Sequence, residues 1–162
     1  AIFLLTVLSP VFLALAIAIK ADSSGPVFYR QVRITQYGRK FRIHKFRSMT
    51  DQADRSGTLV TVKGDNRITK VGRFIRNKRL DELPQLIDVL QGNMSFVGVR
   101  PELPEYVKQY TTEMMDTLLI QAGITSLASI RYQNEAELLK NTEDAERIYI
   151  ERILPEKMKW NL

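Results

Sequence analysis

The clearest pattern along the chain is an apolar run at its beginning. Residues 1–19 carry no charged side chain, and Lys20 is the first charge after them. At about 1.5 Å per residue the run would form a helix about 28 Å long, close to the hydrocarbon thickness of a bilayer. A buried core helix is disfavoured because no face of the run is polar, and the run is long for the apolar part of a signal peptide. We therefore predict a membrane-embedded helix over residues 1–20.

Ser9 and Pro10 lie at the midpoint of this apolar run. Proline removes a backbone hydrogen bond and should kink the helix, while the serine hydroxyl can satisfy a freed carbonyl. A sharp kink would make the segment re-entrant, so that it returns to the side of the membrane from which it came. Lys20 marks the cytoplasmic end by the positive-inside rule. Residues 21–162 are therefore expected to form a cytoplasmic domain.

Alternation of polar and apolar residues replaces the continuous run after the linker Ser23–Pro26. The runs VFYRQVRI and FRIHKFRSM flank the turn sequence TQYGRK, which predicts a β-hairpin. Basic and aromatic residues interleave in it, so a nucleic-acid-binding hairpin is an alternative, although no RNA or DNA motif is recognisable and no nucleic acid partner is expected. His44 is the only histidine of the chain, and a solitary histidine is more often structural than catalytic.

A polar stretch and a basic amphipathic stretch occupy the middle of the chain. Thr50–Asn66 is rich in turn-forming residues and is expected to form a surface loop that orders over a substrate. Arg67–Arg79 places apolar residues on one helical face, with lysines and arginines elsewhere. A helix of this kind lies well on an anionic membrane surface. It would hold the residues that follow it close to the lipid headgroups.

The remainder of the chain is broken by glycine and proline. Residues 93–106 are expected to form an extended loop in which Arg100, held rigidly before a proline, suits an anion clamp; a surface arginine in a turn is the alternative. Helices are predicted over Tyr106–Ala122 and Glu135–Ile153, and Pro155 is expected to end the second. The fold class is therefore α+β and mostly helical, with a kinked re-entrant membrane helix, a small β-hairpin and amphipathic interfacial helices.

Two adjacent carboxylates, Asp81 and Glu82, stand out in the octapeptide RLDELPQL. Because Pro84 is excluded from a helix interior but suits a first turn, a new helix should begin near Asp81 and stop at Gly92. Asp81 would be its N-cap, and both carboxylates would lie at the positive end of the helix dipole, where phosphates also bind. Taken alone, an ordinary helix cap explains this octapeptide without any chemistry.

Composition narrows the classes of partner. The 162 residues suffice for one compact domain with one core. A net charge of +6 indicates an anionic partner such as nucleic acid, an anionic membrane surface or a phosphorylated substrate. The absence of cysteine from this sequence excludes a disulfide framework, thiol catalysis and cysteine-based metal sites within it.

Seven stretches together resemble one family. In order they are an apolar segment with Ser9-Pro10, GPVFYRQ, KFRSM, RITKVGRFIR, LDELPQL, GNMSFVGVRPELPEY and AGITSLASIRYQNE. This chain resembles the bacterial sugar transferases, the monotopic phosphoglycosyl transferases that start glycan and capsule assembly. The resemblance covers essentially the whole chain. It implies a bacterial inner-membrane enzyme with its catalytic domain on the cytoplasmic face.

The resemblance also implies a reaction and its residues. Such enzymes transfer a phosphosugar from a UDP-sugar to polyprenyl (undecaprenyl) phosphate and release UMP. The position of Asp81 matches the aspartate taken to form a covalent phosphosugar intermediate, and Glu82 matches the glutamate that helps to hold Mg²⁺. An ionised carboxylate can act as such a nucleophile, and Mg²⁺ prefers few carboxylates together with phosphate oxygens. Asp81 and Glu82 are thus the predicted catalytic pair and the predicted metal ligands.

Cationic side chains in the matching motifs are the expected phosphate ligands. Lys45 and Arg47 lie in KFRSM, and Arg100 lies in the loop usually written Pro-Arg-Pro, where this chain has Val99 in place of the first proline. Many relatives carry an arginine where this chain has Gln133, and Arg131 is the residue expected to substitute for it. A non-enzymatic basic adaptor on a membrane surface is the rival reading. Neither the identity of the sugar nor the oligomeric state follows from the sequence.

Overall fold

The structure is a computed structural model that describes residues 1–51, 53, 61, 64–133, 135–139 and 145–162. Most of the predicted loop Thr50–Asn66, together with Asn134 and residues 140–144, therefore lies outside the described residues. The described chain divides into two compact units. The first contains Ala1–Gln31, residues 42–51 and Gly64–Gly92, and the second contains Val32–Phe41 and Asn93–Leu162.

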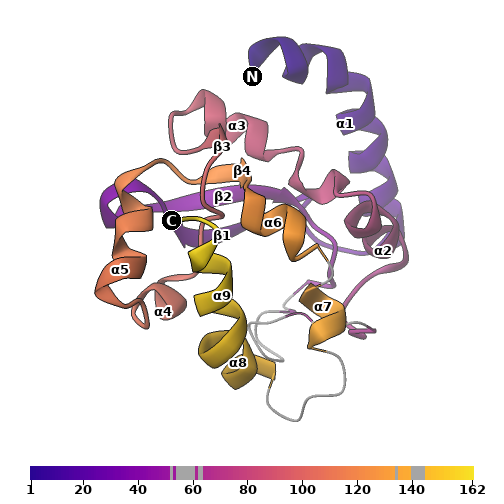
Figure 1. The fold of residues 1–162 in the computed structure, drawn as a ribbon. Coiled ribbons are helices and arrows are strands. Elements are labelled where there is room, and N and C mark those ends of the chain that lie inside the picture. Colours follow the sequence, from indigo (N-terminus) through magenta and orange to yellow (C-terminus); the bar gives the residue numbers. More distant parts are fainter. Residues whose placement is uncertain (52, 54–60, 62–63, 134, 140–144) are drawn as a thin grey trace. The chain divides into compact units, whose positions relative to one another are not determined.

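Most of the described elements are helical, with two small sheets (Figure 1). Up to Gly92 the elements are α1 (Ile2–Asp22), β1 (Phe28–Ile34), the 3-10 helix η1 (Gln36–Gly38), β2 (Lys40–Phe46), α2 (Lys70–Asn77), the 3-10 helix η3 (Leu80–Glu82) and α3 (Gln85–Leu90). Beyond Gly92 they are β3 (Ser95–Val97), α4 (Pro104–Val107), α5 (Thr112–Met115), η4 (Asp116–Leu119), β4 (Gly123–Thr125), α6 (Leu127–Arg131), α7 (Glu135–Leu138), α8 (Ala145–Ile148), the π-helix η5 (Tyr149–Ile153) and α9 (Leu154–Lys159).

The predicted apolar helix is present as α1, which continues through Pro10. Pro10 has no N–H to offer the Thr6 carbonyl, and the Ser9 hydroxyl donates to that carbonyl instead at 2.8 Å. Only Leu15 and Ile19 of this helix are buried. Among the described helices, α1 alone is long and apolar enough to cross a membrane. The predicted kink and the re-entrant path are not established by this continuous helix and stay predictions.

The predicted hairpin is confirmed, because β1 and β2 pair across the short turn η1. Tyr37 and Gly38 turn the chain with φ values of 58° and 73°. Within the first unit, the ring of Phe46 in β2 stacks on the ring of Phe28, with centroids 5.4 Å apart. It also meets the ring of Phe12 edge-on, with centroids 5.2 Å apart. These contacts join the hairpin to a small apolar cluster made of Leu15, Ile19, Phe46 and Ile75.

The basic helix is shorter than Arg67–Arg79. It begins at Lys70 because the Thr69 side chain accepts a hydrogen bond from the Gly72 N–H and so caps it. Ile68 is extended and forms an isolated bridge with Met49. Ile75 is buried in the apolar cluster, whereas the ring of Phe74 is 57% exposed.

The helix after the acidic pair begins later than predicted, and Asp81 is not its N-cap. Pro84 occupies the N-cap position of α3. Since Pro84 lacks an N–H, the Leu80 carbonyl cannot accept an α-helical bond from residue 84 and accepts one from Leu83 at 3.2 Å. The acidic pair therefore lies in the 3-10 turn η3. The end of the helix is as predicted, with Gly92 at φ 71° just after the C-cap.

A second sheet was not predicted. Ser95 and Val97 of β3 pair in parallel with Gly123 and Thr125 of β4, within a region expected to be loop and helix breaker. The two strands approach closely beside Gly98, where a Cβ would collide with the backbone around Gln121. The two strands can therefore pair this closely only because Gly98 has no side chain.

The second unit has its own core, whereas the composition predicted one core for the chain. Its buried members come from the loop after β3, from α4 and α5, from the residue just after α7 and from the C-terminal helices: Val99, Leu103, Tyr106, Met114, Leu139, Ala145, Tyr149, Ile153, Leu154 and Met158. The predicted helix Tyr106–Ala122 is divided into α4, α5 and η4. The prediction that Pro155 ends a helix was wrong, because this proline lies in the first turn of α9, where its missing N–H costs nothing.

Candidate active site

The acidic pair is held in a tight and largely buried turn. Arg79 adopts the left-handed conformation at φ 58°, which ends the run from α2 and turns the chain into η3. Asp81 and Glu82 are each 9% exposed. Carboxylates buried to this degree keep their charge only when cations or hydrogen-bond donors compensate the lost hydration.

Strand β2 supplies one such cation. The Lys45 ammonium lies 3.0 Å from Glu82 Oε1, and both side chains are largely buried. The predicted catalytic glutamate and one predicted phosphate ligand are therefore brought together in the first unit. Because the ion pair stands beside Asp81, it places a fixed positive charge where a phosphate could approach the carboxylates.

A second buried pair joins β2 to α3, and the sequence analysis did not single out its acid. Asp88 of α3 is fully buried and accepts from the His44 backbone N–H at 2.8 Å through Oδ2. Its Oδ1 lies 2.8 Å from Nδ1 of the His44 ring. His44 precedes Lys45, so this contact fixes the part of β2 that presents Lys45. An acidic residue two helical turns beyond Asp81 on an otherwise apolar stretch was the signal available in the sequence.

Arg47 is buried at the end of α1. Its guanidinium donates to the Ser23 carbonyl at 2.7 Å, to the Ile19 carbonyl at 3.3 Å and to the Ser24 carbonyl. A cation that donates to the last carbonyls of a helix also opposes the negative end of the helix dipole. Phosphate binding by Arg47 stays a prediction, and the described contacts give this residue an anchoring role between β2 and α1.

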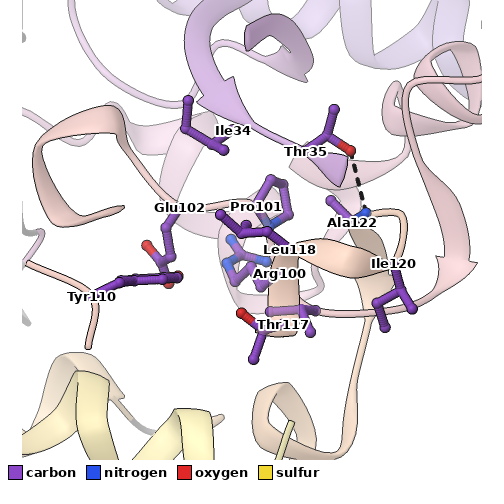
Figure 2. Close-up of a pocket in the computed structure, with 11 residues that line it drawn as sticks. Ile34, Thr35, Arg100, Pro101, Glu102, Tyr110, Thr117, Leu118, Ile120 and Ala122 are labelled. Atoms are coloured by element: carbon purple, nitrogen blue, oxygen red, sulfur yellow. Dashed lines mark hydrogen bonds between the residues drawn. The ribbon is translucent and has the colours of Figure 1, made fainter. Parts of the chain in front are cut away.

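Arg100 belongs to the second unit, where it lines a small pocket (Figure 2). Other residues lining the pocket include Glu102, Tyr110 and Thr117. The preceding residue, Val99, is 6% exposed and packs in the core of this unit. The residue that stands in place of the usual proline is thus an apolar core residue beside the arginine.

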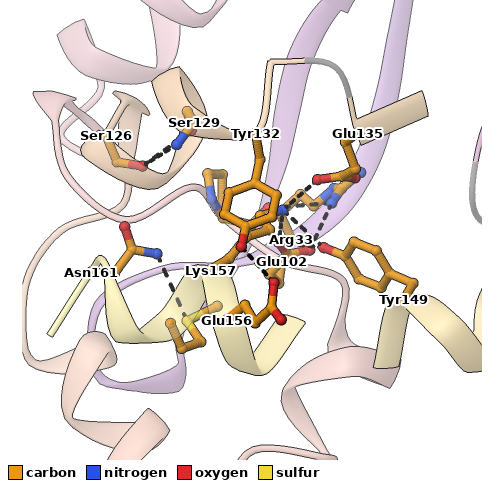
Figure 3. Close-up of polar contacts among 12 residues, drawn as sticks. Arg33, Glu102, Ser126, Ser129, Tyr132, Glu135, Tyr149, Glu156, Lys157 and Asn161 are labelled. Carbon is orange, nitrogen blue, oxygen red and sulfur yellow. Dashed lines mark hydrogen bonds and ion pairs between the residues drawn. The ribbon is translucent and has the colours of Figure 1, made fainter. Parts of the chain in front are cut away.

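The loop that carries Arg100 is tied down through Glu102 (Figure 3). Tyr149 donates to Glu102 Oε1 at 2.8 Å, and the Lys157 ammonium lies 3.5 Å from the same oxygen. Arg33 lies 3.9 Å from Glu102 Oε2 and donates to the Pro101 carbonyl. Burial works to raise the pKa of Glu102, but the charges of Lys157 and Arg33 outweigh it and lower that pKa. An ionised Glu102 therefore anchors the loop.

Arg131 lies at the end of α6 in the second unit. Its guanidinium carbon is 3.8 Å from the centroid of the Trp160 ring, a cation–π contact. The side chain is exposed on the surface of the unit. No position relative to the acidic pair is assigned to Arg100 or Arg131, since both belong to the other unit.

The metal site was predicted on the acidic pair. The described residues contain no group of three or more histidine, aspartate or glutamate side chains that could hold a metal ion. Asp81 and Glu82 offer two neighbouring, largely buried carboxylates. This donor set fits Mg²⁺, which takes hard oxygen ligands and completes its shell with water and substrate phosphate oxygens.

The chain belongs to the bacterial sugar transferase family, whose model matches residues 1–155. It is 40% identical over 144 residues to a Klebsiella pneumoniae protein named UDP-glucose:undecaprenyl-phosphate glucose-1-phosphate transferase, covering 86% of this chain and 31% of that protein. It is 41% identical over 133 residues to an Aeromonas hydrophila protein named UDP-N-acetylgalactosamine-undecaprenyl-phosphate N-acetylgalactosaminephosphotransferase, covering 80% and 31%.

A Bacillus subtilis protein named uncharacterized sugar transferase EpsL is 40% identical over 143 residues, covering 88% of this chain and 70% of that protein. The chain thus spans 31% of the length of the Klebsiella and Aeromonas proteins and 70% of the length of the Bacillus protein. These matches confirm the resemblance drawn from the motifs.

Proposed function

We propose that this chain is a phosphoglycosyl transferase that moves a phosphosugar from a UDP-sugar to undecaprenyl phosphate and releases UMP. The names of its relatives support both substrates. The observation that carries the proposal is the turn holding Asp81 and Glu82, two largely buried carboxylates with the Lys45 ammonium 3.0 Å from Glu82. A helix cap alone does not explain this arrangement, since Pro84 caps α3.

The proposed reaction has two displacements at phosphorus. In the first, an Asp81 carboxylate oxygen attacks the phosphorus that bears the sugar. The bond to the bridging oxygen breaks, and UMP leaves with the electron pair. In the second, an oxygen of undecaprenyl phosphate attacks the same phosphorus, which restores the Asp81 carboxylate and forms the diphosphate-linked sugar. One site can thereby serve a soluble donor and a lipid acceptor in turn.

Lys45 and Glu82 prepare this site electrostatically. Lys45 would stabilise negative charge on the transferred phosphate, and its ion pair with Glu82 holds it in place. Mg²⁺, when bound by the acidic pair, would neutralise charge on the diphosphate. Arg100, Arg131 and Arg47 remain the further candidates for phosphate contacts.

We also propose that α1 enters the membrane from the cytoplasmic face and returns to it. Pro10 in the middle of α1 and the Ser9 bond to the Thr6 carbonyl support a bend there. The ribbon of α1 also curves along its length in Figure 1. Exposed apolar side chains on short helices, such as Phe74, Leu119 and Ile130, support contact with the lipid surface.

The test is a UMP-release assay on the full chain in membranes, with undecaprenyl phosphate and a panel of UDP-sugars. Asp81→Asn is expected to abolish transfer while the donor still binds, because an amide cannot form the acyl phosphate bond to the phosphosugar. The exposed Asp116→Asn is the matched control and should retain full activity. Appreciable turnover by Asp81→Asn would remove Asp81 as nucleophile. No release with any donor, together with binding to anionic vesicles by both variants, would favour the adaptor instead.

A further inference from the structure

Gln85 is a buried amide whose hydrogen-bonding groups are not used within the described chain. The residue is 1% exposed. Neither its Nε2 nor its Oε1 has a hydrogen-bond partner among the described residues. An amide offers two N–H donors and a carbonyl acceptor, and burying them without partners costs stability. A buried polar group without a partner in the protein calls for an explanation, and a ligand that supplies the partner is one such explanation.

Its position relates Gln85 to the acidic pair. Leu83 and Pro84 both keep right-handed helical backbone angles between η3 and α3. Gln85 thus follows Asp81 by about one helical turn, and residues four apart on a helix lie about 6 Å from each other on the same face. Asp88 continues that face, so three buried polar residues form one row along it.

The acidic residues on either side of Gln85 along the chain are already paired. Glu82 is paired with Lys45, and Asp88 holds both the backbone and the ring of His44. Gln85 lies between these two contacts along the chain. The unpaired amide therefore lies about one helical turn along the chain from Asp81, the carboxylate proposed to carry the phosphate.

We infer that Gln85 is a substrate-contacting residue that donates from Nε2 to a non-bridging oxygen of the phosphate while it is carried on Asp81. The inference rests on the proposed function and adds a neutral hydrogen-bond donor to the proposed site. A neutral amide suits this place, because it stabilises charge on the phosphate without competing with Lys45 for the carboxylates. The contact is made only when the phosphate is present, so it favours the transferred group over the ligand-free site.

The test compares Gln85→Met with the unmodified protein. Methionine keeps the length of the side chain and removes the amide. UMP release and formation of the phosphosugar adduct, followed by intact mass, are expected to fall on the order of 100-fold. The melting temperature of the ligand-free protein should not fall, since the substitution removes an unpaired buried amide. Gln91→Met, at an exposed glutamine that is the C-cap of α3, is the matched control and should behave like the unmodified protein.

Two results would overturn the inference. One is Gln85→Met activity within a few-fold of the unmodified protein. The other is a lost activity that comes with a clear fall in melting temperature, which would make Gln85 a structural amide. An unmodified protein that releases no UMP would overturn the proposed function and this inference together, whereas the first result leaves the function standing.

Discussion

At the scale of single residues, the structure gives a role to Asp88, which contacts both the backbone and the ring of His44. His44 was expected to be structural, and its contacts with Asp88 agree with that. Asp88 itself was not singled out from the sequence, where its only signal was an acidic residue on an otherwise apolar stretch. Its structural role comes from its full burial and from its contact with His44 of β2, a strand distant in the sequence.

Asp88→Ala is expected to lower the free energy of unfolding by about 2–4 kcal/mol, because it leaves the buried His44 ring and N–H without their acceptor. UMP release should fall with it, since Lys45 is the next residue along β2. Asp88→Asn keeps one acceptor oxygen and should lose less. Thermal unfolding in detergent measures the effect.

The matched control for this substitution is Asp116→Ala, which changes an exposed aspartate. Its stability should stay within about 0.5 kcal/mol of the unmodified protein, as for most surface substitutions. If Asp88→Ala were no less stable than this control, the clamp between β2 and α3 would have no energetic role.

At the scale of elements, two prolines act in opposite ways. Pro84 prevents a continuous helix from Leu80 and divides it into η3 and α3. Pro10 remains within α1, because the Ser9 hydroxyl accompanies it and satisfies the Thr6 carbonyl. A side-chain donor near the proline therefore lets the apolar helix continue in surroundings where water cannot replace the lost bond.

Replacing Ser9-Pro10 by Ala-Leu restores an N–H to the middle of α1. The helix is expected to straighten and span the membrane, and transfer is expected to fall at least 10-fold as the site moves relative to the headgroups. The sequence contains no cysteine, so single cysteines introduced at either end of α1 can be labelled without background. Accessibility of both ends from one side is expected for the unmodified protein and from opposite sides for the variant. Unchanged labelling and activity would remove the support for a re-entrant path.

At the scale of the whole molecule, each of the two units has its own interior, and they differ in kind. The first unit has a small apolar cluster beside the acidic pair. The second has a larger apolar core that encloses the charged group of Glu102, Lys157 and Tyr149. Burial raises the pKa of Tyr149 well above its usual value, so its hydroxyl stays protonated and donates to Glu102.

The second unit should accordingly lose stability in acid. Because the pKa of Glu102 is lowered in the fold, its ionised form contributes stability above the ordinary glutamate range, about pH 4, and this contribution is lost as the pH falls through the folded pKa. Melting temperatures measured from neutral pH downwards should fall more steeply for the unmodified protein than for Glu102→Gln. The exposed Glu105→Gln serves as control and should follow the unmodified protein. Parallel curves for all three proteins would refute a stabilising role of the Glu102 charge.

Local patterns in the sequence were sufficient for several elements. The apolar run of α1, the alternation in the hairpin and the end of α3 at Gly92 each depend on a few neighbouring residues, so periodicity and turn chemistry identify them. These features are determined by short-range sterics and by hydrophobicity along the chain. The catalytic role predicted for Asp81 and Glu82 came instead from the resemblance to a family, since the octapeptide alone is explained by a helix cap.

The pairing of distant segments required the tertiary structure. The parallel contact of β3 with β4 joins residues Ser95 and Gly123, and the division of the predicted helix between them follows from packing in the second core. The acidic pair remained the centre of the proposed chemistry. Only the tertiary structure showed that the Lys45 ammonium lies 3.0 Å from Glu82 Oε1 and that the buried amide of Gln85 has no partner among the described residues. Burial and charge pairing depend on which segments meet in space, and no local pattern in the sequence specifies that.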